Sequence, residues 1–246
     1  MQRERIDKLL VDHGLAPSRT KAQALVMAGV VLANEQLVNK PSETFAIDSN
    51  IRLKSAGDPA ARYVGRGGLK LEAALQHFQI DVAGLICLDV GASTGGFTDC
   101  LLQHGARKVV AIDVGHNQLD WRLRKDPRVD AREGVNARYL RPEDFPEPFD
   151  LVTIDVAFIS ATMILPAVFG LLTERGRILT LIKPQFEVGK GEVGKGGIVK
   201  ESAKRQRVIR AVNDTAVTLG LRIAGVIESP LKGAEGNIEF LALYER

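Results

Sequence analysis

The fold is decided at residues 88–99, which read Leu88-Asp89-Val90-Gly91-Ala92-Ser93-Thr94-Gly95-Gly96-Phe97-Thr98-Asp99. An apolar run leads into a glycine-rich turn, and helical spacing of apolar side chains follows the turn. Glycine has no Cβ, so a ligand can approach the backbone of such a turn closely. In open α/β sheets, ligands lie outside the carboxyl ends of the strands. The stretch therefore predicts a strand, a ligand-binding turn and a helix.

Strand and helix patterns alternate from this stretch to the end of the chain. We expect strands at 85–90, 108–113, 129–133, 151–155, 178–182, 221–228 and 238–244, and helices at 97–104, 163–172 and 202–219. Such alternation is typical of a doubly wound, mostly parallel sheet. The last connection is too short for a crossover helix, so the final strand should run antiparallel to its neighbour. The predicted fold class is therefore α/β, with a Rossmann-like, seven-stranded sheet.

Residues 3–55 have a different pattern, which predicts a small α+β unit. Its expected elements are helices at 5–13 and 20–28 and strands at 30–32 and 51–53. A stretch rich in glycine, proline and arginine follows, which is typical of a linker. We predict an amino-terminal domain at residues 1–58, a linker at 59–66 and a second domain at 67–246.

The composition is that of an ordinary globular protein and excludes several classes. Of the 246 residues, 45% are hydrophobic and 26% are charged, which argues against disorder and coiled coil. The best candidate for a membrane span, Ala24–Ala33, is shorter than the ~18 residues that a span needs. The N-terminus lacks the apolar core of a secretion signal. Two cysteines cannot build a disulfide framework or a four-cysteine zinc site, so we expect a cytoplasmic protein.

Charge is distributed unevenly along the chain, whose formal net charge is +3. Residues 1–70 hold 11 Lys and Arg against 7 Asp and Glu, whereas residues 71–246 hold 22 against 23. A basic head on a nearly neutral body suggests a polyanionic partner such as nucleic acid. An ordinary solvated surface is the alternative.

The spacing of the glycines bears on which ligand the turn binds. The dinucleotide fingerprint needs glycine at its third position, where this chain has Ser93. The next strand ends at Asp113, and a carboxylate there can bind a ribose diol. NAD and S-adenosylmethionine both carry such a diol, and the glycine spacing favours S-adenosylmethionine. A glycine turn without a ligand is the alternative.

A second glycine-rich stretch, residues 189–196, follows the pattern G-x-x-x-x-G-K. Gly196 stands where a phosphate-binding loop needs Ser or Thr to hold magnesium, so nucleotide hydrolysis is disfavoured. We predict either a flexible basic loop near a substrate phosphate or a plain solvated loop.

Several segments of the chain resemble one family of enzymes. They are Val64-Gly65-Arg66-Gly67-Gly68-Leu69-Lys70-Leu71, Asp89–Phe97, Ile182-Lys183-Pro184-Gln185-Phe186-Glu187 and Val193-Gly194-Lys195-Gly196-Gly197. These segments resemble the TlyA family of bacterial ribosomal-RNA ribose 2′-O-methyltransferases, which are often labelled hemolysins. The head resembles the RNA-binding domain of ribosomal protein S-four, at Arg5-Ile6-Asp7, Leu10, Gly14, Ser18-Arg19, Ala22, Gly29, Val31, Asn34 and Lys40-Pro41. The body resembles the FtsJ-like (RrmJ-like) class I methyltransferases, and the whole resemblance covers essentially the full chain.

The resemblance implies a set of site residues. The catalytic Lys-Asp-Lys-Glu set corresponds to Lys70, Asp155, Lys183 and Glu239. The S-adenosylmethionine site corresponds to Gly91, Ser93, Gly95, Phe97, Asp113, Asn136 and Asp155, with Asn136 facing the adenine. The expected phosphate contacts to ribosomal RNA or ribosomal subunits are Arg5, Arg19, Lys21, Arg62 and Arg66. No metal is expected, because the four histidines are scattered along the chain.

Methyl transfer to ribose needs a base, because the 2′-hydroxyl must lose its proton as it attacks. A lysine serves as that base only if its pKa falls from about 10.4, through burial or a neighbouring cation. We hypothesise that Lys183 is the base, Lys70 the neighbouring cation and Asp155 the orienting carboxylate. Glu239 would hold Lys70 or the ribose, and ordinary salt bridges are the alternative for all four residues.

Three other functions compete with methyl transfer. A membrane-damaging protein would need a spanning or strongly amphipathic basic segment, and the sequence predicts none. An RNA-binding module without activity would share the fold, because fold alone does not establish function. An NAD-dependent enzyme on the same architecture is disfavoured by Ser93.

Overall fold

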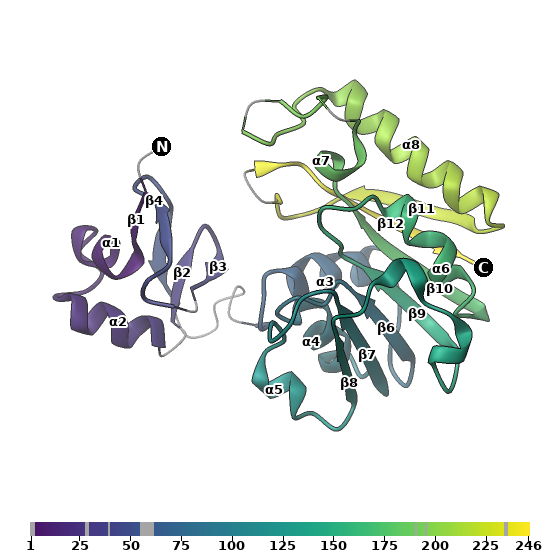
Figure 1. Ribbon diagram of the computed structural model, residues 1–246, viewed down its shortest axis with the longest axis horizontal. Helices are drawn as coiled ribbons and strands as arrows, with labels where there is room; N and C mark the ends of the chain where they lie inside the picture. Colours follow the sequence, from purple (N-terminus) through teal and green to yellow (C-terminus); the bar gives the residue numbers. More distant parts are fainter. Residues whose placement is uncertain are drawn as a thin grey trace. The chain divides into compact units, whose positions relative to one another are not determined.

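The computed structural model describes residues 3–27, 30–38, 40–54, 62–189, 191–194, 196–233 and 236–246. The chain forms two units, Met1–Arg66 and Gly67–Arg246 (Figure 1). The features predicted from the sequence that lie outside the described residues are Ala28, Gly29, residues 59–61 of the linker, Lys190 and Lys195.

The amino-terminal unit is built from short elements. They are β1 (Arg3–Arg5), α1 (Ile6–Asp12), α2 (Arg19–Met27), β2 (Val31–Ala33), β3 (Gln36–Leu37), β4 (Thr44–Ala46) and β5 (Ile51–Leu53). β1 pairs with β4, and β2 pairs with both β3 and β5, all antiparallel. β2 and β5 lie where strands were expected, at 30–32 and 51–53, whereas β1, β3 and β4 were not predicted.

One buried carboxylate organises the helices of this unit. Asp7, with no exposed surface, accepts hydrogen bonds from Arg5 Nε (3.0 Å) and Nη2 (2.9 Å). Arg19 Nη2 (3.1 Å) and Gln23 Nε2 (2.9 Å) reach the same carboxylate from α2. The hydrogen bonds from Arg5 and these neighbours hold the pKa of Asp7 far below its usual range. α1 and α2 are therefore joined by charge as well as by apolar packing.

The second unit alternates strands and helices. Its elements are α3 (Gly67–His77), β6 (Ile86–Val90), α4 (Gly96–Gln103), β7 (Lys108–Asp113), α5 (Trp121–Arg124), β8 (Val129–Glu133), β9 (Phe149–Ile154), α6 (Leu165–Phe169), β10 (Leu172–Ile182), α7 (Pro184–Glu187), α8 (Ser202–Thr218), β11 (Arg222–Glu228) and β12 (Phe240–Glu245).

The strands form one seven-stranded sheet in the order β11-β12-β10-β9-β6-β7-β8 (Figure 1). β12 runs antiparallel to β10 and β11, and the pairs among β10, β9, β6, β7 and β8 are parallel. The predicted fold class is therefore confirmed, including the antiparallel last strand. Parallel neighbours bring the carboxyl ends of β6, β7, β9 and β10 to one edge of the sheet, where a ligand site is expected.

Alternate residues of β6 show how helices cover both faces of the sheet. Leu88 and Val90 belong to a core that includes residues of α6 and α8. Asp89, between them, bonds to Thr98 of α4. Because successive side chains of a strand point to opposite faces, α4 covers one face while α6 and α8 cover the other. β6 is buried along its whole length between these layers.

The predicted helix at 163–172 is wrong in its bounds. The structure has a 3₁₀ turn at Ala161–Met163, the short helix α6, and a strand that already begins at Leu172. Pro166 stands in the first turn of α6, where its missing N–H costs nothing, and Gly170 caps the other end. Leu172 then pairs with Phe149 of β9. Sheet pairing therefore overrides the local helical spacing at Leu172.

Candidate active site

The glycine turn between β6 and α4 requires glycine at two of its positions. Gly91 has a φ of +82°, and a Cβ there would stand 2.5 Å from the backbone oxygen of Asp155. Gly95 has a φ of +97°, and a Cβ there would stand 2.2 Å from Leu123 Cδ1. Only glycine tolerates both the left-handed backbone and this crowding. The turn therefore lies directly against the end of β9, which carries Asp155.

Asp113 at the end of β7 is fixed beside the turn. Its Oδ2 accepts the Ser93 N–H (2.8 Å), and its Oδ1 accepts the Gly115 N–H (2.7 Å). A carboxylate offers about four acceptor positions, so two backbone bonds leave capacity for further hydroxyl donors. The structure thus brings Gly91, Ser93 and Asp113 together, in an arrangement suited to a ribose diol.

Two other predicted cofactor residues are less directly placed for contact. Phe97 is buried, and a Cβ on Gly67 would stand 3.3 Å from its ring, so the ring packs beneath the start of α3. Asn136 is exposed after β8, and its side-chain oxygen accepts the Arg138 N–H at 3.1 Å. If Asn136 faces the adenine, as predicted, its side-chain NH₂ group is the part that remains to donate a hydrogen bond to the base.

Asp89 is a buried carboxylate that the sequence did not single out. It accepts hydrogen bonds from Thr98 Oγ1 (2.7 Å) and Thr153 Oγ1 (2.9 Å), which join β6 to α4 and β9. Burial raises the pKa of Asp89 to about 6, although the two hydroxyls favour the charged form. The only signal in the sequence was a charge inside an apolar strand.

Lys70 and Glu239 form a buried ion pair. Lys70 Nζ on α3 lies 2.5 Å from Glu239 Oε2, and the two side chains are 6% and 2% exposed. Gln185 Nε2 donates to the other Glu239 oxygen at 3.3 Å. A Cβ on Gly233 would stand 1.9 Å from that oxygen, so the backbone closes over it. This pair is sealed from solvent on the sides that the structure describes.

Lys183 and Asp155 form a second pair of the same length in a more open place. Lys183 Nζ lies 2.5 Å from Asp155 Oδ1, and the side chains are 14% and 22% exposed. Asp155 Oδ1 is buried and lacks a hydrogen-bond alignment with any described donor, so charge alone joins it to the ammonium. The pair lies where the parallel strands β9 and β10 end side by side.

Two contacts bring the pairs together beside the glycine turn. Gly67, at the start of α3, would place a Cβ 3.8 Å from Asp155 Oδ2, one turn before Lys70. Gln185, two residues after Lys183, bonds to Glu239. Gln185 Oε1 is itself buried and has no hydrogen-bond partner among the described residues.

An exposed aromatic residue stands at the same edge and was missed from the sequence. Phe158, after β9, is 90% exposed and has a φ of +64°. Its ring lies 5.1 Å from that of Phe186 on α7, at an interplanar angle of 52°. A bulky side chain in the left-handed region is rare and costly, so the surroundings must hold it there.

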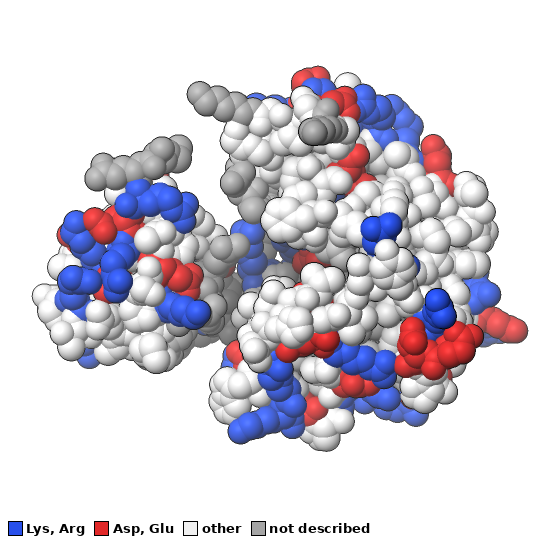
Figure 2. All heavy atoms as spheres, in the orientation of Figure 1, with Lys and Arg blue, Asp and Glu red and all other residues white. Residues whose placement is uncertain are grey.

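The side chains predicted to bind RNA all belong to the amino-terminal unit. Arg5 and Arg19 are 42% and 56% exposed while bound to Asp7, and Lys21 is exposed. Arg62 lies over the ring of Tyr63 at 5.5 Å, and Arg66 is half-buried. Lys and Arg side chains, interleaved with acidic ones, spread over the visible face of this unit (Figure 2).

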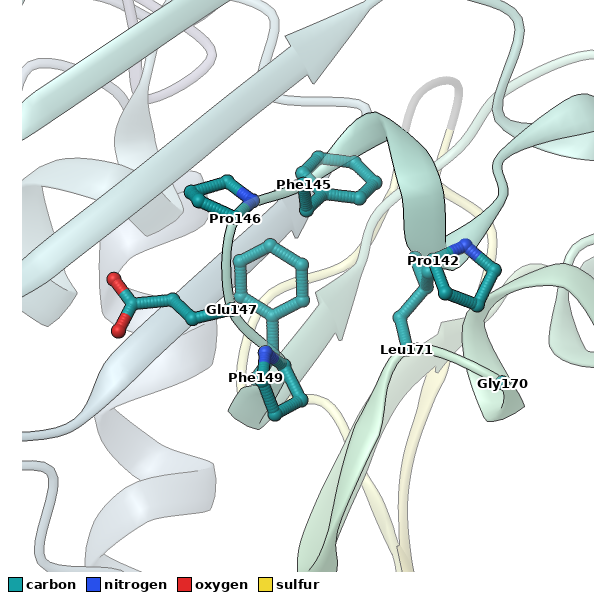
Figure 3. Close-up of a pocket in the computed structure, with 8 residues that line it drawn as sticks. Pro142, Phe145, Pro146, Glu147, Phe149, Gly170 and Leu171 are labelled. Carbon is teal, nitrogen blue, oxygen red and sulfur yellow. The ribbon is translucent and has the colours of Figure 1, made fainter.

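A hollow elsewhere on the second unit is distinct from this site. It is lined by Pro142, Phe145, Pro146, Glu147, Pro148, Phe149, Gly170 and Leu171 (Figure 3). Phe149 and Leu171 stand where β9 and β10 begin, at the opposite edge from Asp155 and Lys183. Its volume, about 140 Å³, is below the roughly 300–1,000 Å³ of small-molecule sites.

Comparison with known families decides what kind of protein this is. Residues 63–246 match the FtsJ-like methyltransferases, and residues 4–47 match the S4 domain. The chain belongs to the FtsJ-like methyltransferase family. The resemblance stated from the sequence is thereby confirmed, as are the fold class and the assignment as a methyltransferase.

Relatives match over nearly the whole chain. The chain is 47% identical over 239 residues to the Mycobacterium tuberculosis protein named 16S/23S rRNA (cytidine-2′-O)-methyltransferase TlyA, which covers 97% of this chain and 88% of that one. It is 43% identical over 239 residues to hemolysin A of Brachyspira hyodysenteriae, covering 97% and 98%. A solved structure from Streptococcus thermophilus, described as a candidate hemolysin, has a TM-score of 0.78 and 45% identity, covering 100% and 89%.

Among the described residues, no helix has both the length and the apolar character that crossing a membrane requires. Within the same residues, no cluster of three or more His, Cys, Asp or Glu side chains is arranged to hold a metal ion.

Proposed function

We propose that the protein transfers a methyl group from S-adenosylmethionine to a ribose 2′-hydroxyl of ribosomal RNA in the cytoplasm, with Lys183 as general base. The observation that carries this proposal is the open Lys183–Asp155 pair beside the glycine turn. The names of relatives support it, because two relatives are named for rRNA (cytidine-2′-O)-methylation.

The residues of the turn fit S-adenosylmethionine. Gly91 packs against the backbone of Asp155, which keeps the turn close to the end of β9, and Asp113 has acceptor capacity for the ribose diol. Asn136 is the residue we assign to the adenine. When bound, S-adenosylmethionine supplies an electrophilic methyl group on a positively charged sulfur. The chain therefore has to supply alignment and a proton acceptor, not an activating metal.

Lys183 is the side chain best placed to accept the proton of the 2′-hydroxyl. The ammonium paired with Asp155 first releases a proton to solvent, so that Nζ can take the hydroxyl proton as a neutral amine. The Asp155 carboxylate, 2.5 Å away, then stabilises the ammonium that results. The pair is more exposed than the Lys70–Glu239 pair, so a ribose can reach it.

We assign Lys70 and Glu239 to positioning. The Glu239 carboxylate compensates the charge of Lys70 within a buried pair. We therefore expect Lys70 to act by fixing the position of its neighbours and not as an uncompensated cation beside Lys183. Gln185 transmits that position to the segment that carries Lys183.

The amino-terminal unit would hold the RNA by its backbone. Arg5, Arg19, Lys21, Arg62 and Arg66 are assigned to phosphate contacts, which give affinity and salt dependence without reading the bases. The target nucleotide would be single-stranded or locally opened, because the attacked hydroxyl must reach the pair at the strand ends.

Transfer of tritiated methyl from S-adenosylmethionine to purified ribosomal subunits tests this function. We expect label in the RNA fraction and, after digestion, in a 2′-O-methylated nucleoside. Label confined to protein or to a base would contradict the proposal. Binding of S-adenosylmethionine without any transfer would favour the inactive RNA-binding alternative.

A further inference from the structure

Glu187 is the last residue of α7, the short helix that follows β10, and its side chain bonds to the loop that follows β9. Its Oε1 accepts the Ala161 N–H at 2.7 Å, and its Oε2 accepts a short hydrogen bond from the Ser160 hydroxyl. Glu187 comes four residues after Lys183, and Ser160 comes five residues after Asp155. The clamp therefore connects the two segments that carry the open Lys–Asp pair.

The chemistry of this clamp is unusual for a half-buried carboxylate. Its two hydrogen-bond donors are a hydroxyl and a backbone amide, not a cation. Burial raises the pKa of Glu187, against the effect of these two hydrogen bonds. An apolar residue at this position would avoid the free-energy cost of desolvating a charge, so the hydrogen bonds of the carboxylate must offset that cost.

The hydroxyl of Ser160 has its hydrogen-bonding capacity fully used. It donates to Glu187, lies 2.6 Å from Thr162 Oγ1 and accepts the Thr162 N–H at 3.1 Å, where it caps the 3₁₀ turn. With its one proton on Glu187, both of its acceptor positions serve Thr162. In this arrangement residue 187 accepts a hydrogen bond at both of its side-chain atoms, which a carboxylate can do and an amide cannot.

The segment held in this way is strained and exposed. Phe158 has a φ of +64° and a 90% exposed side chain, and it contacts Phe186, the neighbour of Glu187. A strained backbone persists only where surrounding contacts over-determine it. The Phe158–Phe186 contact and the Glu187 hydrogen bonds are two such contacts, and they act between the same two loops.

We propose that Glu187 is a positioning residue that locks the loop after β9 onto α7 and so holds Asp155 opposite Lys183. The inference rests on the proposed function for its kinetic consequence, because only a reacting pair needs this alignment. The hydrogen bonds themselves can be tested without any assay of activity.

The first test uses Glu187→Ala, Glu187→Gln and Ser160→Ala, with Glu147→Ala as a matched control. Glu147 is also a partly exposed glutamate, but it pairs with Arg107 at the opposite edge of the sheet. Hydrogen exchange of the Ala161 amide should accelerate by ~10-fold or more in Glu187→Ala, because an unbonded amide is no longer protected. Exchange at the wild-type rate would overturn the clamp whatever the enzyme does.

The second test is kinetic and separates positioning from general stability. Glu187→Ala should lower kcat on ribosomal subunits by ~10- to 100-fold, since small misplacements of reacting groups cost that much. The Kd for S-adenosylmethionine should change much less than kcat, because Gly91, Ser93 and Asp113 are not part of the clamp and Asp155 is the one predicted cofactor residue that it holds. An unchanged kcat, with transfer by the wild type established, would refute the positioning role and leave the proposed function intact.

Glu187→Gln keeps the size of the side chain and distinguishes the carboxylate from its volume. The amide retains one acceptor for Ala161 and meets the Ser160 oxygen with a donor, so kcat should fall part of the way. The variant Ser160→Ala/Glu187→Gln should be no slower than Glu187→Gln alone, because the mismatch has been removed. If the losses of kcat from the two substitutions add up in the double variant, the donor and acceptor roles assigned to Ser160 and Glu187 are wrong.

Discussion

The two Lys–carboxylate pairs of the site are alike in chemistry and differ in burial. Each has an ammonium 2.5 Å from a carboxylate oxygen. Lys70 and Glu239 are 6% and 2% exposed, whereas Lys183 and Asp155 are 14% and 22% exposed. The chemistry of the pairs alone therefore does not assign their roles. Their exposure does, because the Lys183–Asp155 pair is the one that a group on a polymeric substrate can reach.

Burial also decides what each pair contributes to stability. Removing one member of a sealed pair leaves a buried charge without a partner, which is strongly unfavourable. Removing one member of the more open pair leaves a charge that water reaches more easily, so the loss of stability is smaller. The contrast predicts opposite consequences for substitutions at Lys70 and Lys183, in activity and in stability.

The largest expected effect is on activity at Lys183. Lys183→Ala should reduce methyl transfer by ~1,000-fold or more, in line with the loss of a general base. Its Kd for S-adenosylmethionine and its thermal unfolding should stay close to the wild type, which isothermal calorimetry and scanning calorimetry can measure. Turnover above a tenth of the wild-type rate would remove Lys183 from the role of base.

The next effect is on stability at the sealed pair. Lys70→Met should lower the free energy of unfolding by about 3–5 kcal/mol, because Glu239 is then left buried and unpaired. Lys70→Met/Glu239→Leu should recover much of that loss, as urea unfolding of both variants would show. If Lys70→Met and Lys183→Met destabilise equally, the distinction between the pairs is wrong.

Asp89 sharpens the comparison, because it is buried with two threonine hydroxyls and no cation. Its pKa of about 6 lies above its ordinary value of 3.8, so the folded state binds its proton more tightly than the unfolded state. Stability contributed by Asp89 is therefore present below pH 4 and is lost as the pH rises to 6, by up to about 3 kcal/mol.

Unfolding by urea between pH 4 and pH 7 measures this effect as a difference between the wild type and Asp89→Asn. The wild type should lose stability relative to the variant as the pH rises, because asparagine keeps hydrogen-bonding capacity and does not titrate. Parallel pH profiles for the two proteins would show that Asp89 ionises normally.

The smallest expected effect is on RNA binding, and it compares a paired with an unpaired basic side chain among the described residues of the amino-terminal unit. Arg19 is engaged by Asp7, whereas Lys21 is exposed. Lys21→Ala should raise the KM for RNA a few-fold without changing kcat, and should reduce the salt slope of RNA binding by about 1. A filter-binding titration over salt concentration checks this. A change in kcat would mean that Lys21 does more than bind phosphate.

Much of the fold was predictable because its signals are local. The glycine turn, the alternating strands and the short connection before β12 lie in continuous stretches of sequence. The helix expected at 163–172 failed because Leu172 pairs with Phe149, a contact that local spacing does not contain. β1 and β4 were missed for the same reason, because Arg3–Arg5 pairs with Thr44–Ala46, far along the chain.

The site was predictable as a set of residues, through a family resemblance, but not as an arrangement. Lys70 and Glu239 are 169 positions apart, and the pairing hypothesised for them came from the resemblance, not from any local pattern in the sequence. The pairing of Asp7 with Arg19 and the hydrogen bond between Glu187 and Ser160 are likewise contacts between residues far apart in the sequence. Such partners follow from how strand ends and helices meet, which composition and periodicity do not encode.

Lys183→Arg gives the most direct test of a neutral amine acting at the open pair. Arginine keeps a cation beside Asp155 but holds its proton at any working pH. The measurement is the yield of alkali-resistant, 2′-O-methylated linkages in ribosomal RNA incubated with each protein and S-adenosylmethionine. We predict resistant linkages with the wild type and none with Lys183→Arg, at equal affinity for S-adenosylmethionine. Equal yields from the two proteins would contradict the account.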